Sequence, residues 1–151
     1  MMIIASLLLA AQLDACHVLS KEDVAAVQGE SFTEAKLSTR GKLTTCFYQL
    51  PTFSDSISVD VMRGGAHEYW EENFEGEGGR EREREEDEKE AALQRVSGVG
   101  SEAFWVGARG TGSLFVRKGD SMVRVSVGGA GTAEEKIRKA KTLALRALKK
   151  L

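Results

Sequence analysis

The chain has 151 residues, of which 42% are hydrophobic and 29% charged, and its formal net charge at pH 7 is −2. This length fits one domain with a sizeable core. The small net charge excludes a strong overall attraction to nucleic acid or acidic membranes, and no apolar run reaches the roughly 18 residues of a spanning helix. We therefore expect no nucleic-acid partner and no stable membrane span.

The first segment, residues 1–11, is apolar and ends in small side chains. This pattern is typical of the hydrophobic region of a secretory signal peptide. The basic stretch that normally opens such a signal is missing, because no Lys or Arg precedes Lys21. Export is the favoured interpretation, with one domain over 12–151. The alternative is an apolar first strand or helix of the domain itself.

A short capped helix is predicted over 21–28. Ser20 is a favourable N-cap residue, and Asp23 three residues later forms a short-armed capping box with it. Two valines inside the segment lie at helical spacing. Gly29 suits the left-handed conformation that commonly follows the end of a helix.

Two strands are predicted next. Residues 44–50 are rich in β-branched and aromatic side chains, 51–55 contain the single proline, and 56–63 alternate apolar with polar residues. Together they predict an antiparallel hairpin with one buried face. Cys46 and Tyr48 share a face of the first strand, so Cys46 can point toward the first helix.

Cys16 and Cys46 are the two cysteines of the chain. In an exported protein this number favours one disulfide, and closing a loop of about 30 residues stabilises the fold by roughly 3–4 kcal/mol. The alternative is a lipid anchor through Cys16, because residues 13–16 loosely resemble a lipobox. Asp14 departs from the small residue of that motif, and lipidation would leave Cys46 unpaired.

A second helix is predicted over 66–74, and a charged insert follows at 76–90. Its segment 80–90 contains four basic and seven acidic residues and no apolar side chain. Opposite charges four positions apart could support a solvated helix, but the composition equally suits disorder. The simpler interpretation is a solvated surface segment, and the functional alternative is a partner-binding arm.

The rest of the chain predicts three strands, over 103–106, 113–118 and 122–127, and a last helix that begins at Thr132. An apolar stripe continues along this helix to the C-terminus. The predicted fold class is α+β, with a single antiparallel sheet of about five strands and helices packed on one face. The predicted order is α-β-β-α-β-β-β-α.

No residue pattern indicates catalysis, a cofactor or a metal. The glycine-rich segment 127–132 lies between a strand and a helix, where phosphate loops occur, but it lacks the residues and spacing of known phosphate motifs. A flexible connection is the simpler interpretation. His17 and His67 have no neighbouring ligand at the spacing of a zinc site.

Three aromatic residues are the candidates for a pocket or interaction surface, because pockets are commonly lined by such side chains. They are Tyr48, Trp70 and Trp105.

Several short motifs resemble those of small exported bacterial proteins and lipoproteins of unknown function that contain a cysteine pair. The motifs are Asp14-Ala15-Cys16, the Leu19-Ser20 cap, the helix that ends at Gly29, Cys46-x-Tyr48, and the block over 98–105. The resemblance covers residues 12–151. It implies an extracytoplasmic α+β domain with a Cys16–Cys46 bond, and it implies no activity.

We interpret the chain as an exported, envelope-associated binding or structural domain, periplasmic or secreted, that is not an enzyme. Its partner could be another envelope protein. The alternative is a small hydrolase or ligand-binding protein whose site residues are dispersed along the chain. A concave pocket with convergent polar groups would distinguish the second possibility from the first.

Overall fold

A computed structural model describes residues 14–74, 92–108 and 111–151. The predicted signal segment at 1–11 and the charged insert at 76–90 lie outside these ranges and stay predictions. Within the described ranges the elements are α1 (Lys21–Gln28), β1 (Glu34–Arg40), β2 (Leu43–Gln49), a 3-10 helix η1 (Phe53–Asp55), β3 (Ile57–Arg63), α2 (Ala66–Asn73), β4 (Ala92–Arg95), β5 (Glu102–Ala108), β6 (Thr111–Lys118), β7 (Ser121–Val127) and α4 (Ala133–Leu148).

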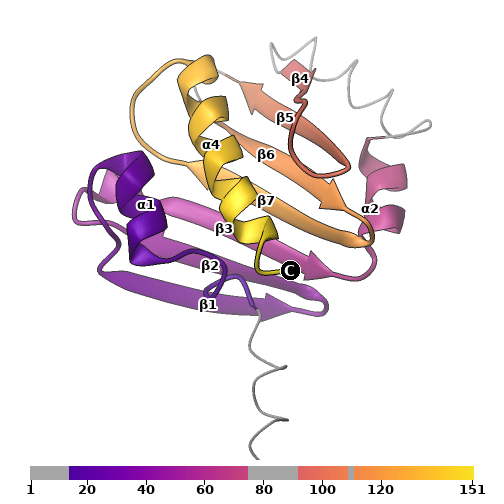
Figure 1. The fold of residues 1–151 in the computed structure, drawn as a ribbon, viewed down its shortest axis with the longest axis horizontal. Coiled ribbons are helices and arrows are strands. Elements are labelled where there is room, and N and C mark those ends of the chain that lie inside the picture. The colour runs from indigo at the N-terminus through magenta and orange to yellow at the C-terminus, as the bar shows by residue number, and fades with distance from the viewer. Residues whose placement is uncertain (1–13, 75–91, 109–110) are drawn as a thin grey trace, which may run out of the picture.

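The strands form one antiparallel sheet of seven, in the order β1-β2-β3-β7-β6-β5-β4 (Figure 1). Two meanders, β1 to β3 and β4 to β7, are joined where β3 pairs with β7. This confirms the predicted α+β class with a single antiparallel sheet. The predicted number of about five strands is wrong, because β1 and β4 were missed.

Both missed strands lie at the edges of the sheet. All residues of β1 are exposed, so its sequence lacks the alternation that marks a strand with one buried face. β4 has only four residues. Periodicity detects strands through the contrast between their faces, and edge strands show little of it.

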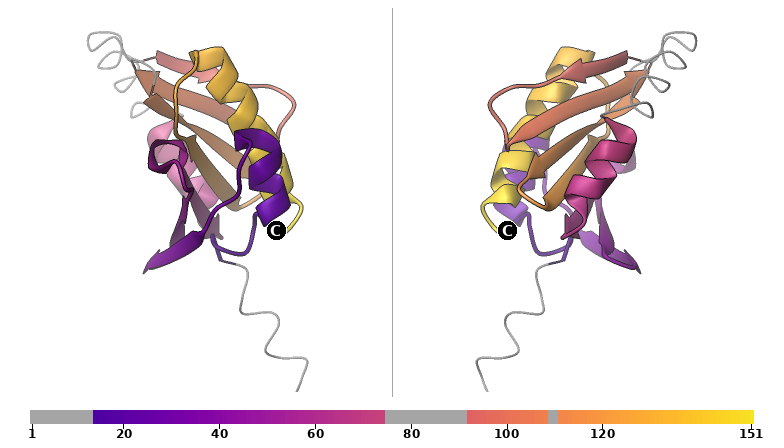
Figure 2. Two further views of the ribbon diagram at one scale, coloured as in Figure 1. Left: turned by 90° about the vertical axis from the view of Figure 1, so that its left-hand side faces the viewer. Right: turned by 90° about the vertical axis from the view of Figure 1, so that its right-hand side faces the viewer.

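The helices cover both faces of the sheet, which corrects the prediction that they all pack on one face. α1 and α4 lie on one face, and α2 lies on the other (Figure 2). The buried residues alternate accordingly along β5, where Trp105 belongs to the core beneath α1 and α4 and Phe104 to the core beneath α2. We call these two sides of the sheet the inner face and the outer face.

The inner core is the larger of the two. Val24 of α1 and five residues of α4 pack onto the valine-rich strands β3 and β7. Each fully buried Val or Leu contributes about 1.5–3 kcal/mol relative to exposure. The α4 residues in this core are Ala140, Leu143, Ala144, Ala147 and Leu148.

The helix ends follow the predicted caps. The Ser20 hydroxyl accepts from the Asp23 N–H at 3.0 Å, and the Asp23 carboxylate accepts from the Ser20 N–H at 2.9 Å, which confirms the capping box. Gly29 is left-handed, with φ of 82°. At α4, Thr132 accepts from the Glu135 N–H at 3.2 Å.

α2 is capped by a residue from a distant hairpin. Asp120, in the turn between β6 and β7, accepts from the N–H groups of Gly65 and His67, both at 3.0 Å. These two hydrogen bonds favour the charged carboxylate, so the pKa of Asp120 is lowered, chiefly by the bond from His67. The hairpin therefore fixes the start of α2.

Among helices of the described ranges, none has the length and apolar character that a membrane span requires.

Candidate functional site

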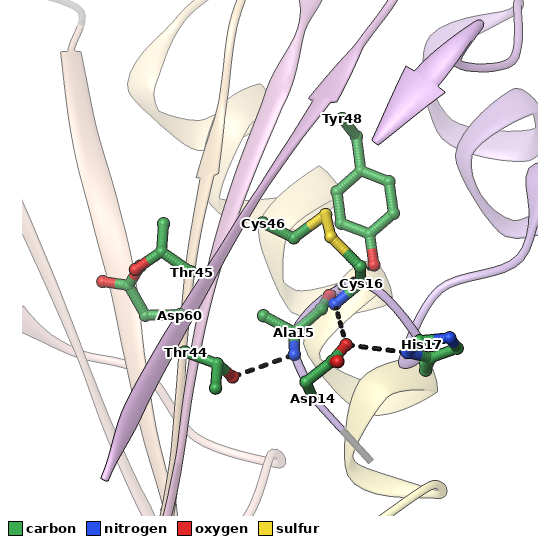
Figure 3. The surroundings of a disulfide bond; sticks show 9 residues. All are labelled: Asp14, Ala15, Cys16, His17, Thr44, Thr45, Cys46, Tyr48 and Asp60. Atoms are coloured by element: carbon green, nitrogen blue, oxygen red, sulfur yellow. Dashed lines mark hydrogen bonds and ion pairs between the residues drawn. A yellow bond between two sulfur atoms is a disulfide. The ribbon is translucent and has the colours of Figure 1, made fainter. Parts of the chain in front are cut away.

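The two cysteines form the predicted disulfide. Cys16 and Cys46 are bonded, with their Cα atoms 5.0 Å apart. Figure 3 shows Cys46 on the same side of β2 as Tyr48, with Thr45 on the opposite side next to Asp60 of β3. The bond ties the segment before α1 to β2, the strand next to the edge strand β1. It also uses both sulfur atoms, so neither is a nucleophile and Cys16 cannot carry a lipid in this structure.

Hydrogen bonds hold the same segment beside the disulfide. The Ala15 N–H donates to the Thr44 hydroxyl at 2.9 Å, and the Tyr48 hydroxyl donates to the Ala15 carbonyl at 2.5 Å (Figure 3). Burial raises the pKa of the Tyr48 hydroxyl, so it stays protonated and keeps donating. These contacts anchor the segment before α1 to β2.

The structure does not bring the three predicted pocket residues together. Tyr48 and Trp105 are 0% and 3% exposed in the inner core, whereas Trp70 is 1% exposed in the outer core. All three are therefore packing residues. Their large apolar area made them candidates from the sequence, and the same area explains why they are buried.

The histidines take part in local ion pairs. His17 contacts Asp14 at 2.7 Å, and His67 contacts Glu71 at 3.1 Å, and both histidine side chains are more than half exposed. Within 14–74, 92–108 and 111–151, no group of three or more His, Cys, Asp or Glu side chains is arranged to hold a metal ion.

The outer face carries a site that the sequence analysis missed. Ser58 of β3 pairs in register with Ser126 of β7, and the Ser126 hydroxyl hydrogen-bonds to the Ser113 hydroxyl of β6. Because β3, β7 and β6 are adjacent, the three hydroxyls form a line across the sheet. We call these three residues the serine row. Phe47 of β2 extends the line on the side of β3.

Arg124 lies next to the serine row on the same face, two residues before Ser126. One of its terminal nitrogens donates to Ser113 at 2.8 Å and to Ser126 at 2.9 Å, and the other lies 3.5 Å from Ser58. Its Nε donates to the Asp60 carboxylate at 2.5 Å, and Asp60 also accepts from Thr45 at 2.7 Å. The guanidinium is therefore fixed in position by residues of three adjacent strands, β3, β7 and β6.

These contacts decide what the serine hydroxyls can do. A guanidinium has no acceptor atom, so the serine oxygens accept from Arg124 and each hydroxyl proton must be donated elsewhere. Ser113 and Ser126 also hydrogen-bond to each other, which uses one proton. The remaining proton of that pair and the proton of Ser58 are available to groups above the sheet. The serine row is thus a set of positioned donors.

An open groove of about 720 Å³ lies over the serine row, and we call it the serine groove. Phe47 lines one side, and the neighbouring Phe53 is 65% exposed, with ring centroids 5.7 Å apart. The loop after β7 closes the far end. Its residues Gly128, Gly129 and Ala130 line the groove together with Ser54, Ser56 and Lys136.

The glycine-rich loop has a structural reason for its composition. The Gly128 N–H donates to the Ser56 carbonyl at 3.0 Å, and a Cβ at Gly128 would overlap the carbonyl oxygens of Ser54 and Ser56. Gln28 of α1 reaches the same place, donating to the carbonyls of Asp55 at 2.8 Å and Gly128 at 3.2 Å. Close packing therefore requires Gly128, and the loop is a fixed wall of the groove.

Part of this site was visible in the sequence. Ser58 and Ser126 are polar positions in alternating strands, so their outward direction could be predicted. Their alignment could not be predicted, because it depends on the pairing of β3 with β7. Residues 64–120 separate these two strands in the sequence. Register between non-consecutive strands has no local signal.

No protein-family model matches the sequence, and no curated protein matches it. Among solved structures, the chain is similar to a GTP binding regulator from Thermotoga maritima, with 11% sequence identity and a TM-score of 0.39. The similarity covers 87% of this chain and 92% of that protein. Similarity at this level does not establish a shared fold or function.

Proposed function

We propose that the protein is an exported, non-enzymatic binding domain that holds its ligand in the serine groove. The observation that carries the proposal is the serine row, three hydroxyls aligned across adjacent strands and oriented by Arg124. Positioned donors at the floor of an open groove are the usual means by which a binding site orients its ligand. The ligand would present oxygen acceptors to Ser58 and to the Ser113–Ser126 pair.

The disulfide supports the export part of the proposal. Structural disulfides persist in oxidising compartments and are rare in reducing ones. Cys46 is 0% exposed and its bond joins two elements of the inner core, which is the arrangement of a structural rather than a catalytic disulfide. With the apolar segment 1–11, this favours a periplasmic or secreted protein over a lipid-anchored one.

The contacts of the serine row favour binding over hydrolysis. A serine becomes a nucleophile when a neighbouring base accepts its proton. The partner of all three serines is the Arg124 guanidinium, which has no acceptor atom and cannot act as that base. In the described part of the chain, the two histidines lie elsewhere, paired with Asp14 and Glu71. Among the described residues, therefore, no histidine lies beside the serine row to act as the base of the hydrolase alternative.

The walls of the groove indicate the chemistry of the ligand. The floor offers hydroxyl donors, and Lys136 also lines the groove, which suits a carboxylate or phosphate oxygen. Phe47 and the exposed Phe53 offer aromatic surface a short distance away. A ligand with an oxoanion next to an apolar group would use both. Benzoate and phenyl phosphate combine these features and serve as probes, and benzyl alcohol is the control without an anion.

The test is a titration of isotope-labelled protein followed by amide chemical shifts. We expect benzoate or phenyl phosphate to shift the amides of the serine row and Gly129, and benzyl alcohol to shift them much less. Ser126→Ala should weaken the response, whereas Ser97→Ala, at an exposed position outside the groove, should not. The proposal would be overturned if neither anion shifted the amides of the serine row. It would also be overturned if the Ser126→Ala variant responded to the anions as strongly as the wild type.

A further inference from the structure

The free edge of the sheet at β1 is the second unexplained surface. β1 pairs with β2 on one side, and among the residues that the structure describes no strand pairs with its other side. All its residues are exposed, including Leu37 at its centre, which is 49% exposed. Proteins usually protect an edge of this length by covering it, by shortening it, by interrupting it with a bulge or proline, or by placing charged side chains along it. Glu34–Arg40 pairs with β2 without a bulge and contains no proline, and its charged residues Glu34, Lys36 and Arg40 are of both signs, so a strand of matching charge can still pair with it.

The pairing with β2 determines which backbone groups of β1 are unused. Arg40 and Leu43 flank a two-residue turn, and such residues exchange hydrogen bonds with each other. At the other end, Thr33 donates to the carbonyl of Gln49, the residue in register with Glu34. Hydrogen bonding alternates along an antiparallel strand. The even-numbered residues of β1 therefore point to β2, and Ala35, Leu37 and Thr39 point their N–H and C=O groups outward.

We propose that two copies of the protein pair through antiparallel β1 strands, centred on Leu37. In this register, Leu37 meets Leu37 of the partner subunit, and Ala35 meets Thr39 of the partner subunit. These are the residues whose backbone groups point outward, so donors and acceptors match along the strand. The two sheets become one continuous sheet, and a two-fold axis between the strands closes the assembly.

The side chains match in the same register. Glu34 lies opposite Arg40 of the partner subunit, and the two-fold axis creates this contact twice. Opposite charges at directly facing positions stabilise paired strands, whereas like charges destabilise them. Lys36 faces Ser38 of the partner subunit, so no like charges face each other directly. On the other face of the sheet, the exposed Leu37 side chains meet and leave water.

The other edge does not fit as well. β4 has four residues against seven in β1. A contact between β1 of one copy and β4 of the next would be head-to-tail and would leave a free edge at each end. Pairing of β1 with itself buries the longer edge in both copies.

The test exchanges the charges and measures mass by sedimentation equilibrium over a wide concentration range. The wild-type protein should show a concentration-dependent dimer. Glu34→Arg places arginine opposite arginine twice, and Arg40→Glu places glutamate opposite glutamate twice. Each single variant should raise the dissociation constant at least ~10-fold. An equimolar mixture of the two should dimerise again, because every facing pair is then of opposite charge.

Glu72→Arg is the matched control, since it makes the same charge change at an exposed site on α2 and should dimerise like the wild type. The Glu34 side chain is 57% exposed, and Arg40 is also exposed, so melting curves of dilute samples should show both single variants folded. A monomeric wild type at all concentrations would overturn the proposal. The proposal would also be overturned if the single variants dimerised like the wild type, or if their mixture stayed monomeric.

Discussion

Removing the disulfide should destabilise the fold by an amount set mainly by the loop it closes. Cys16 and Cys46 are separated by 30 positions. In the chain-entropy model, a loop of this length stabilises by about 3.6 kcal/mol at 25 °C. The Cys16→Ala/Cys46→Ala variant is the suitable perturbation, because serine at position 46 would bury a hydroxyl where the cysteine is 0% exposed.

The native segment should stay in place when the bond is removed. Ala15 keeps its hydrogen bonds to Thr44 and Tyr48 in the folded state. The loss of stability should therefore arise chiefly because the unfolded chain gains conformational entropy without the crosslink. Residual structure in the open unfolded chain would make the loss smaller than the loop estimate. The slope of stability against urea should rise, because a chain without the crosslink exposes more surface on unfolding.

Urea unfolding followed by tryptophan fluorescence measures this loss, since Trp70 and Trp105 are both buried. Cys16→Ala and Cys46→Ala alone should each lose about as much as the double variant, because the bond needs both sulfurs. Independent effects would instead add to about 7 kcal/mol in the double variant. A double variant within about 1 kcal/mol of the wild type would refute the reasoning, because the loop would then contribute little.

Three further substitutions test the outer core, the inner core and the cap of α2. Trp70→Ala should lower the free energy of unfolding in urea by about 3–5 kcal/mol, because it opens a cavity in the outer core and removes the 2.7 Å hydrogen bond from the Trp70 indole N–H to Glu102; an effect below about 1 kcal/mol would contradict that packing. Gly112→Ala should lower the melting temperature, because its Cβ would overlap the Trp105 ring, and an unchanged value would contradict the contact. The pKa of Asp120 is lowered in the folded state, so its charge stabilises above pH 3.8 and this contribution is lost as the pH falls through the folded value. Asp120→Asn should therefore lower the melting temperature at neutral pH and lower it less below pH 3.8, whereas a constant difference would contradict the linkage.

Features with a local cause were predictable from the sequence. The Ser20–Asp23 capping box and the left-handed Gly29 depend on neighbouring residues, and the predicted helix over 21–28 has those bounds in the structure. The strands with one buried face were found because apolar and polar side chains alternate along them. The cysteine pair followed from composition and compartment.

Features that depend on pairing between distant segments were not predictable. Leu37 lies among exposed residues of an edge strand, so β1 has no apolar face to mark it. The side of the sheet that α2 covers depends on which residues of β5 and β6 point outward and on the cap from Asp120. The serine row exists only because Ser58 and Ser126 fall in register across β3 and β7.

The most direct test of the proposed function is native mass spectrometry of the protein isolated from its host without unfolding. The wild type should carry an added mass of a small molecule with a carboxylate or phosphate group. The Ser58→Ala/Ser126→Ala variant, prepared in parallel, should have lost it, and Ser97→Ala should retain it. Wild-type protein without added mass, or the same added mass on the serine-row variant, would contradict a ligand held by the serine row.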